Sequence, residues 1–203
     1  NVMVGYYEDE EETAKTIVDG WLHTGDMGYI PAEHPEFLYV VGRFKSLLIS
    51  ADGEKYSPEG IEESLVDGSP YIDQCMLYNN QSSYTMGLLV PNVAALKRTL
   101  SEKKLDLSQK EGQEMAISIL KDAIDQYRKG GKNEGLFPER WLPTVFVIAD
   151  EAFTEANHML NSTMKMVRAK VVEHYSKEID FAYTPNAKDV NNDVNRSALA
   201  KLQ

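Results

Sequence analysis

From residue 50 onward, segments patterned as strands alternate along the chain with segments patterned as helices. The longest helical pattern follows the capping-box sequence Ser108-Gln109-Lys110-Glu111 and ends at Gly130-Gly131. Its apolar residues recur at helical spacing: Met115, Ile119, Leu120, Ile124 and Tyr127. Because strands and amphipathic helices in this order can bury one shared core, the alternation predicts an α+β domain with a small antiparallel sheet covered by helices.

Further strands and helices follow from local signals. The apolar segments 71–78 and 84–90 flank the turn-forming residues 79–82, which favours an antiparallel hairpin. A third strand is predicted at 144–149, where apolar and β-branched residues dominate. Helices are expected at three more places: after Ser57-Pro58, which would supply a cap and a first-turn proline before Gly68 ends the helix, after Pro91-Asn92, and through Val167, Val171, Val172 and Tyr175.

The N-terminal region is patterned differently and predicts β structure. Apolar stretches at 37–41 and 47–49 are separated by polar residues at 42–46, which indicates two short strands around a turn. We expect three parts: residues 1–43 as the β-rich end of a larger N-terminal domain that is mostly absent from this sequence, residues 44–183 as a C-terminal α+β domain, and residues 184–203 as a polar, Asn-rich tail with room for a short terminal helix.

Charge and composition exclude several classes of function. With 203 residues, of which 42% are hydrophobic, the chain is long enough for one good core or two modest ones. Its net charge of −11 would repel phosphates, so no broad contact with nucleic acid is predicted. No run of about 18 uncharged apolar residues occurs. The expectation is a cytoplasmic protein without a transmembrane segment, with membrane contact only peripheral and through the larger protein.

Neither cysteine nor metal chemistry is indicated. The single cysteine, Cys75, lies in an apolar-rich stretch, which favours a buried and unreactive thiol. The four histidines show none of the short spacings that zinc sites favour: His23, His34, His158 and His174. No metal site is therefore predicted in this chain.

Three segments carry groups suited to chemistry. The first reads Gly20-Trp21-Leu22-His23-Thr24-Gly25-Asp26. A Thr-Gly-Asp turn can present the Asp26 carboxylate to the vicinal hydroxyls of a ribose. In isolation, however, the tripeptide fits better an aspartate that accepts hydrogen bonds from its own turn.

The second segment contains two cations on a turn between strands. It reads Val41-Gly42-Arg43-Phe44-Lys45-Ser46-Leu47-Leu48-Ile49 and continues through Asp52-Gly53-Glu54-Lys55-Tyr56-Ser57-Pro58 to Ile61-Glu62. Arg43 and Lys45 suit a paired grip on an anion or a polar joint that changes partners. On composition alone, ordinary surface cations are the default interpretation.

The third segment places a lysine in a loop before a helix. It reads Leu160-Asn161-Ser162-Thr163-Met164-Lys165-Met166-Val167-Arg168. At this place Lys165 gains nothing from the helix dipole, so it is either solvated or serves an anionic ligand. As a point charge it could neutralise the negative charge that develops when a carboxylate attacks a phosphate.

In this order the three segments resemble the late motifs of adenylate-forming ligases, which include acyl-CoA synthetases, peptide-synthetase adenylation domains and beetle luciferases. The resemblance extends from Val2-Met3-Val4-Gly5-Tyr6-Tyr7 through Arg168 and covers most of the chain. Peptide synthetases usually carry Gly before the motif lysine and Asp at the hinge, whereas this chain has Met164 and Lys45. That favours acyl-CoA synthetases of the long-chain fatty acid type. These often carry Thr-Pro where this chain has Asn161-Ser162, which would make the loop less rigid.

The resemblance implies a role for each matching residue. Asp26 would bind the ribose hydroxyls of ATP with help from Arg43, and Lys45 would lie at the hinge about which the C-terminal domain swings. Gly53 would lie on the loop that approaches the pantetheine channel after that swing. Lys165 would contact the reacting carboxylate and the α-phosphate during adenylation.

The implied activity is that of an acid–thiol ligase. Fatty acid and ATP would form an acyl-adenylate and pyrophosphate, and the thiol of CoA would then displace AMP. ATP and CoA are the expected cofactors, and Mg²⁺ would come with the N-terminal domain, the expected partner. Because no Gly/Ser/Thr-rich phosphate loop occurs here, this chain alone is expected to be inactive. Two alternatives stay open: a ligase with a different acyl acceptor, and a noncatalytic regulatory module derived from a ligase.

Overall fold

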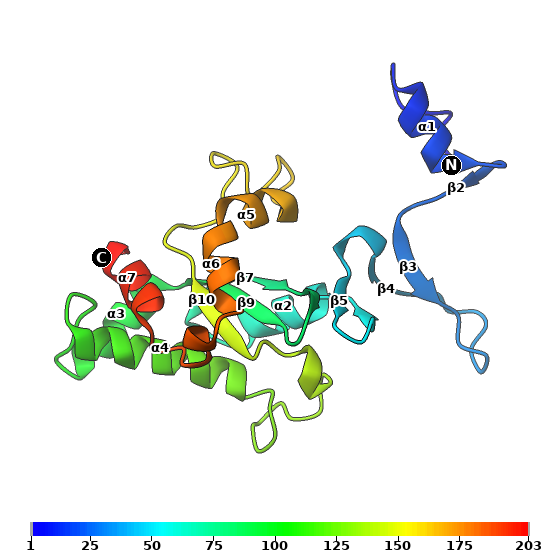
Figure 1. Ribbon diagram of the computed structural model, residues 1–203. Coiled ribbons are helices and arrows are strands. Elements are labelled where there is room, and N and C mark those ends of the chain that lie inside the picture. The colour runs from blue at the N-terminus through cyan, green and yellow to red at the C-terminus, as the bar shows by residue number, and fades with distance from the viewer. Residues whose placement is uncertain (1, 203) are drawn as a thin grey trace. The chain divides into compact units, whose positions relative to one another are not determined.

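The computed structural model describes residues 2–202. The chain divides into two compact units, Asn1–Leu47 and Leu48–Gln203 (Figure 1). The division falls directly after Leu47, whereas the sequence pattern places the boundary after residue 43. The two units differ sharply in how much apolar surface they bury.

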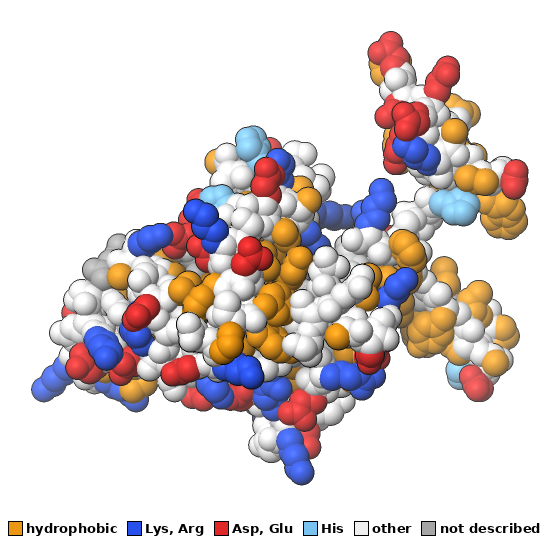
Figure 2. Space-filling view, viewed as in Figure 1, with side chains coloured by type: hydrophobic (Ala, Val, Ile, Leu, Met, Phe, Trp, Pro, Cys, Tyr) orange, Lys and Arg blue, Asp and Glu red, His pale blue; other side chains and the backbone are white. Residues whose placement is uncertain are grey.

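The first unit consists of short elements. Helix α1 (Glu10–Thr16) precedes two antiparallel strand pairs, β1 (Ile17–Val18) with β2 (Trp21–Leu22) and β3 (Asp26–Tyr29) with β4 (Tyr39–Arg43), and the 3-10 turn η1 (Phe44–Ser46) follows. The expected β structure is therefore present, with β4 two residues later than the pattern predicts. None of residues 2–47 is buried, and apolar side chains lie on the surface of this unit (Figure 2).

The second unit is built on a three-stranded sheet. Strands β7 (Ile72–Tyr78) and β9 (Met86–Pro91) pair antiparallel, as the hairpin pattern predicts. Strand β10 (Val145–Ile148) instead lies parallel to β9. Between them the chain runs through α3 (Val93–Glu102) and α4 (Lys110–Asp125), and a connection of this length can return it in the same direction. The α+β class is thus confirmed, but the predicted antiparallel sheet is mixed.

Helices cover both faces of this sheet. Neighbouring side chains on a strand point to opposite faces, so Leu89 and Phe146 join one core cluster while Leu88 and Val147 join the other. The first face packs against α2 (Glu59–Asp67), α3, α4 and α7 (Asp193–Lys201), and the second against α5 (Arg168–His174) and α6 (Ser176–Ala182). Every residue of β9 and β10 is therefore buried.

A smaller sheet in the same unit supports one of the candidate loops. Strand β5 (Leu48–Ser50) pairs antiparallel with β6 (Lys55–Tyr56) and parallel with β8 (Asn80–Ser82). Residues 79–82, predicted only as a hairpin turn, thus also supply a strand. The turn between β5 and β6 carries Gly53.

The starts of the helices agree with the sequence at one place and differ at two. The Asn92 side chain caps α3 by accepting the Ala95 N–H at 2.9 Å. Ser57 and Ser108, predicted as caps, do not cap α2 and α4. A serine hydroxyl also bonds to local acceptors other than the helix backbone. These two hydroxyls donate to nearby carboxylates, those of Glu59 and Asp106, respectively.

Residues 184–202, expected as a polar tail, contribute to the core. They form the 3-10 turn η3 (Pro185–Lys188) and α7. The buried apolar residues of the segment are Ala187, Val190, Ala198 and Leu199. Asn195 is fully buried, and its polar atoms are satisfied there. Its side chain accepts the Ile148 N–H at 2.8 Å and donates to the Phe146 carbonyl at 3.1 Å. A residue that the polar pattern places in a tail is therefore buried, and it forms hydrogen bonds with backbone groups of strand β10.

Candidate functional site

Asp26 and Arg43 lie opposite each other on the first unit. They are paired residues of strands β3 and β4. Arg43 Nε stands 3.3 Å from Asp26 Oδ1, and the two side chains are 62% and 38% exposed, respectively. The antiparallel pairing thus brings together two residues that the sequence presents in separate segments, and leaves an exposed carboxylate oriented by a cation.

The turn before β3 has the conformation that its residues favour. Gly25 has a φ of +77°, a left-handed conformation that glycine adopts readily. The Asp26 N–H donates to Thr24 Oγ1 at 3.1 Å, and the Phe44 N–H donates to the Gly25 carbonyl at 2.8 Å. The turn therefore uses the backbone of Asp26, while its carboxylate pairs with Arg43.

Lys45 belongs to η1, at the end of the first unit. It is exposed, and the second unit begins at Leu48. Lys45 therefore stands at the place where the chain leaves one unit for the other.

Gly53 occupies the tip of a tight turn between β5 and β6. The Gly53 N–H donates to the Ser50 carbonyl at 2.9 Å, and the Ser50 N–H donates to the Glu54 carbonyl at 3.0 Å. Asp52 accepts the Ser50 hydroxyl and the Glu54 N–H, and the hydroxyl bond lowers the pKa of Asp52. Gly53 has a φ of +83°, and no heavy atom lies within 4 Å of where its Cβ would stand. The turn is fixed at its base and open at its tip.

Two residues that follow Gly53, Glu54 just before β6 and Tyr56 at its end, contact η2 (Glu139–Trp141). The Arg140 guanidinium donates two hydrogen bonds to the Glu54 carboxylate, both 2.6 Å long. These bonds lower the pKa of Glu54. Two residues further on, the Tyr56 ring stacks on Trp141 with centroids 5.0 Å apart and planes within 4°. An ion pair and a ring stack thus attach the Gly53 turn to η2.

Lys165 lies in a loop organised by one asparagine. Asn161 Oδ1 accepts the N–H groups of Thr163 and Lys165 at 3.0 and 2.9 Å and the Thr163 hydroxyl at 2.8 Å. The Asn161 N–H donates back to the Lys165 carbonyl at 2.9 Å. Met164 adopts a left-handed φ of +61° and is 68% exposed. The Lys165 side chain is exposed, on a backbone that Asn161 holds in place.

The end of this loop is anchored by an ion pair between Arg168, whose side chain is 22% exposed, and the buried Glu62. Arg168, the first residue of α5, bonds to Glu62 of α2 and donates to the Leu77 carbonyl at 3.2 Å. Glu62 also accepts the Leu77 N–H at 2.6 Å and is 7% exposed. Burial raises the pKa of Glu62, and the Arg168 charge opposes that shift. Arg168 therefore fixes α5, and with it the end of the Lys165 loop, against β7.

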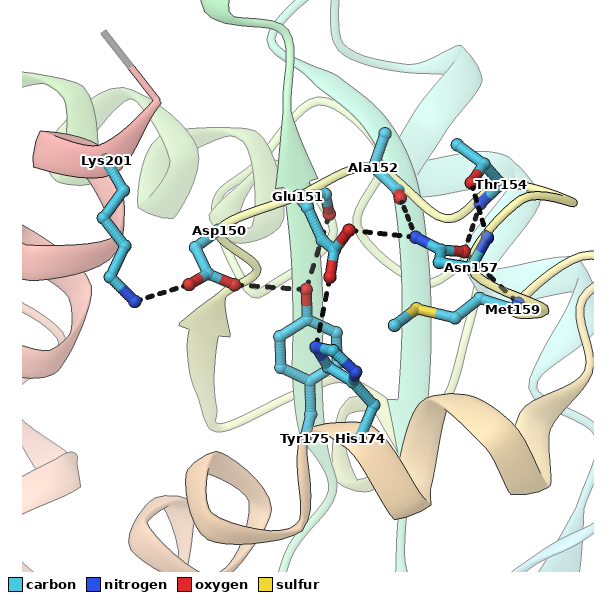
Figure 3. Close-up of polar contacts among 9 residues, drawn as sticks. All are labelled: Asp150, Glu151, Ala152, Thr154, Asn157, Met159, His174, Tyr175 and Lys201. Atoms are coloured by element: carbon cyan, nitrogen blue, oxygen red, sulfur yellow. Dashed lines mark hydrogen bonds and ion pairs between the residues drawn. The ribbon is translucent and has the colours of Figure 1, made fainter.

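The segment that leads from β10 to the Lys165 loop is held by further polar contacts (Figure 3). Asp150 accepts a hydrogen bond from Lys201 Nζ at 2.6 Å, which lowers the pKa of Asp150. Glu151 lies 3.2 Å from His174 Nε2 and accepts a hydrogen bond from Asn157 at 3.1 Å. These contacts join the segment to α7 and α5.

The structure brings some predicted residues together and separates others. Asp26 and Arg43 form a pair, whereas Gly53 and Lys165 lie on different loops with different partners. Sequence reasoning did not find the partner Arg140, because it is 86 positions from Glu54. The Glu62–Arg168 pair is separated by 106 positions. No local spacing signals such a contact.

Residues 2–202 contain neither a cluster of metal-binding side chains nor a membrane-spanning helix, and their cysteine is buried. In this range no group of three or more His, Cys, Asp or Glu side chains is arranged to hold a metal ion. Cys75 is buried as predicted, and burial raises the pKa of its thiol. No helix in the described part of the chain is long and apolar enough to cross a membrane.

Comparison with solved structures identifies the class to which this fold corresponds. No family model matches the chain. The structure is similar to the adenylation domain of a carboxylate reductase from Mycobacterium chelonae, with a TM-score of 0.73 and 25% identity. The match covers 89% of this chain and 26% of that one. The chain thus has the fold of a part of the adenylate-forming enzymes.

Relatives found by sequence similarity indicate a narrower class of enzyme than the solved structures do. Fatty acyl-CoA synthetase B of Dictyostelium discoideum is 29% identical over 188 residues, which cover 91% of this chain and 27% of the relative. Long-chain-fatty-acid–CoA ligase ACSBG1 of Homo sapiens is 30% identical over 202 residues, which cover 90% and 27%, respectively. The chain is therefore a homologue of the long-chain fatty acid CoA ligases, and it spans about a quarter of the length of these relatives.

Proposed function

We propose that the chain is the C-terminal part of a cytoplasmic, ATP-dependent long-chain fatty acid CoA ligase. In the full-length protein, fatty acid and ATP would form an acyl-adenylate and pyrophosphate, and the CoA thiol would then accept the acyl group and release AMP. The observation that carries the proposal is the similarity to fatty acyl-CoA synthetases over 90% or more of this chain.

The first unit supports the proposal that a larger N-terminal domain completes the enzyme. Several of its large apolar side chains are mostly exposed, including Tyr7 at 90%, Trp21 at 77% and Leu38 at 66%. Large apolar side chains exposed in this number on one unit normally face another part of a protein. Because the chain spans only 27% of the relatives' length, the remaining sequence is long enough to supply that cover. The chain alone is therefore expected to be inactive.

Asp26 and Arg43 are the proposed ribose site for ATP. The exposed Asp26 carboxylate could accept both vicinal hydroxyls while Arg43 orients it. Lys45 is the proposed hinge, because it lies just before the boundary between the two units. A rotation there would let one catalytic centre meet different loops of the second unit in turn.

Lys165 is the proposed cation for adenylation. Negative charge develops where the fatty acid carboxylate attacks the α-phosphate, and a preorganised ammonium group stabilises it. The bonds from Asn161 hold the Lys165 backbone, and the exposed side chain is free to extend toward a ligand. No protein nucleophile is needed, because adenylation itself makes the carboxylate a good electrophile.

Gly53 is the proposed residue for the thioester half. Its open tip would let a pantetheine chain pass close to the backbone, and a side chain there would narrow the approach. Mg²⁺ would neutralise phosphate charge, and its ligands are expected in the N-terminal domain of the full-length protein.

A different acyl acceptor is the second candidate. It is favoured by the similarity to an adenylation domain of a carboxylate reductase, an enzyme named for a different reaction. A regulatory module without catalysis is the third hypothesis. The combination of Asp26, Arg43 and Lys165 in one chain argues against it.

The test uses the full-length parent protein. Pyrophosphate exchange and CoA thioester formation are measured across fatty acids of different chain length. We expect both activities with long-chain acids. Exchange without thioester formation would favour another acceptor, and the absence of both with every acid would refute the ligase proposal.

A lysine variant tests the residue assignment. Lys165→Ala should lower pyrophosphate exchange by roughly a hundredfold or more, the usual effect of removing one group that stabilises transition-state charge. It should spare most thioester formation from supplied acyl-adenylate. Lys170→Ala, which removes an exposed lysine of α5, is the control and should change neither half. Equal loss of both halves in Lys165→Ala would contradict the assigned role.

A further inference from the structure

The turn that carries Gly53 has an open tip and a fixed base. Its own backbone bonds between Ser50, Gly53 and Glu54 set the shape of the turn. They do not set the direction in which the turn leaves the domain, because all of them lie within the turn. That direction is set by contacts to other elements: β5 pairs with β8 before the turn, and η2 contacts residues after it.

Two contacts to η2 supply the attachment on the side that follows Gly53. Arg140 holds Glu54 through two parallel hydrogen bonds, and Trp141 stacks on Tyr56. The contacts come from neighbouring residues of η2 and reach positions directly after Gly53. Attachment points at Glu54, just before the short strand β6, and at Tyr56, its last residue, restrict both the position and the rotation of this segment.

The Arg140–Glu54 pair is poorly suited to a role in stability alone. The side chains are 64% and 27% exposed, respectively, and solvent screens such a pair. Its geometry is nevertheless restrictive, because a bidentate guanidinium–carboxylate contact defines a plane and a direction. The pair is better suited to orienting the turn than to holding the domain together.

We propose that Arg140 and Glu54 are positioning residues that aim the Gly53 turn for the thioester-forming half of the reaction. The inference rests on the proposed ligase function and adds two residues to it. Arg140 acts through Glu54 on Gly53 and touches neither acyl group nor nucleotide.

The effect should be confined to one half of the reaction. The Lys165 loop depends on Asn161 and on the Glu62–Arg168 pair, and neither contact involves η2. Loss of the Arg140–Glu54 pair should therefore disturb thioester formation and leave adenylation intact.

The chain contains a closely matched control pair. Lys201 and Asp150 also join two distant elements through a contact of 2.6 Å, with exposures of 66% and 30% (Figure 3). Charge reversal at Lys201 therefore removes an ion pair of the same length and similar exposure, away from the Gly53 turn.

The first measurement uses the 203-residue chain. Amide hydrogen exchange at Ser50 and Gly53 should become faster in Arg140→Glu, because the turn loses one of its two attachments to η2. It should stay unchanged in Lys201→Glu. Unchanged exchange in both variants would overturn the inference independently of any enzyme activity.

The second measurement uses the full-length ligase. Arg140→Glu should lower thioester formation from supplied acyl-adenylate by about ten- to a hundredfold, the range expected for a displaced group. Pyrophosphate exchange should stay within about twofold of wild type. The reversed pair Arg140→Glu with Glu54→Arg should recover most of the loss, and Lys201→Glu should change neither half.

The outcomes separate this inference from the function on which it rests. If wild type is active in both halves and Arg140→Glu changes neither activity, only the proposed positioning role is refuted. Equal loss of both halves, or no recovery in the reversed pair, also overturns it. If wild type is inactive in both halves, the ligase proposal and the inference fall together.

Discussion

Removal of Arg168 should destabilise the second unit strongly and in a pH-dependent manner. Its guanidinium is paired with Glu62, which is 7% exposed. In Arg168→Met the carboxylate would keep the Leu77 N–H as a partner but lose the opposite charge. Breaking a buried ion pair from one side typically costs about 3–5 kcal/mol.

Protonation of Glu62 removes the unpaired charge and so limits that penalty. The free energy needed to protonate the carboxyl depends on pH, and this sets the pH dependence of the destabilisation. One pKa unit corresponds to about 1.36 kcal/mol. From an ordinary pKa of 4.5, neutralising the carboxyl costs about 5 kcal/mol at pH 8 and about 1.4 kcal/mol at pH 5.5. The destabilisation by Arg168→Met should therefore be about 3–5 kcal/mol at pH 8 and smaller by about 2 kcal/mol or more at pH 5.5.

The direction of this dependence follows from the raised pKa of Glu62. Because the folded state raises that pKa above 4.5, the protonated carboxyl favours folding. This contribution is fully present below pH 4.5 and is lost as the pH rises through the folded-state pKa. Without Arg168 the folded-state pKa rises further, so the loss extends to higher pH.

The assay is urea denaturation of the 203-residue chain, followed by circular dichroism at pH 5.5 and pH 8. Wild type is measured at both pH values, because the net charge of −11 alone makes stability pH-dependent. The double variant Arg168→Met with Glu62→Leu should recover most of the pH 8 loss, since it leaves no unpaired charge. A penalty independent of pH, or a double variant as unstable as the sum of the single ones, would refute the reasoning.

Three further outcomes can be checked on the same chain. Gly53→Ala and Gly135→Ala should each cost about 1–2 kcal/mol in urea denaturation, because both positions have a φ of +83° and open space around the added methyl; a much larger loss at Gly53 alone would contradict this. Leu199→Ala should cost about 2–5 kcal/mol by the same assay, because Leu199 is fully buried, and a loss below about 1 kcal/mol would show that the C-terminal segment is not part of the core. Asn161→Ala should speed hydrogen exchange at the Lys165 amide, which loses its acceptor, and unchanged exchange would mean that Asn161 does not organise that loop.

Local sequence signals predicted the elements that depend on neighbouring residues. The β7–β9 hairpin follows from two apolar segments around a turn, and Asn92 caps α3 as its position before the helix suggests. The prediction of caps at Ser57 and Ser108 was wrong. Their hydroxyls donate to nearby carboxylates, and local spacing does not distinguish the two partners.

For the candidate residues, too, the sequence identified the residues themselves but not the distant groups that orient them. Resemblance of ordered motifs singled out Asp26, Arg43, Lys45, Gly53 and Lys165, whose proposed roles remain to be tested. Their surroundings could not be derived in the same way, because the groups that orient them lie far away along the chain. Arg140 has no motif around it, and only folding brings it to Glu54.

The sequence by itself determined the α+β class, the amphipathic helices and the homology to long-chain fatty acid CoA ligases, because periodicity and motif order are properties of the chain. Only the tertiary structure decided that β10 runs parallel to β9, that Asn195 and Leu199 enter the core, and which ion pairs hold the two loops. The physical reason is that strand direction, burial and ion pairing depend on which distant surfaces meet. A polar residue such as Asn195 can be buried once the backbone of a neighbouring strand supplies its hydrogen bonds.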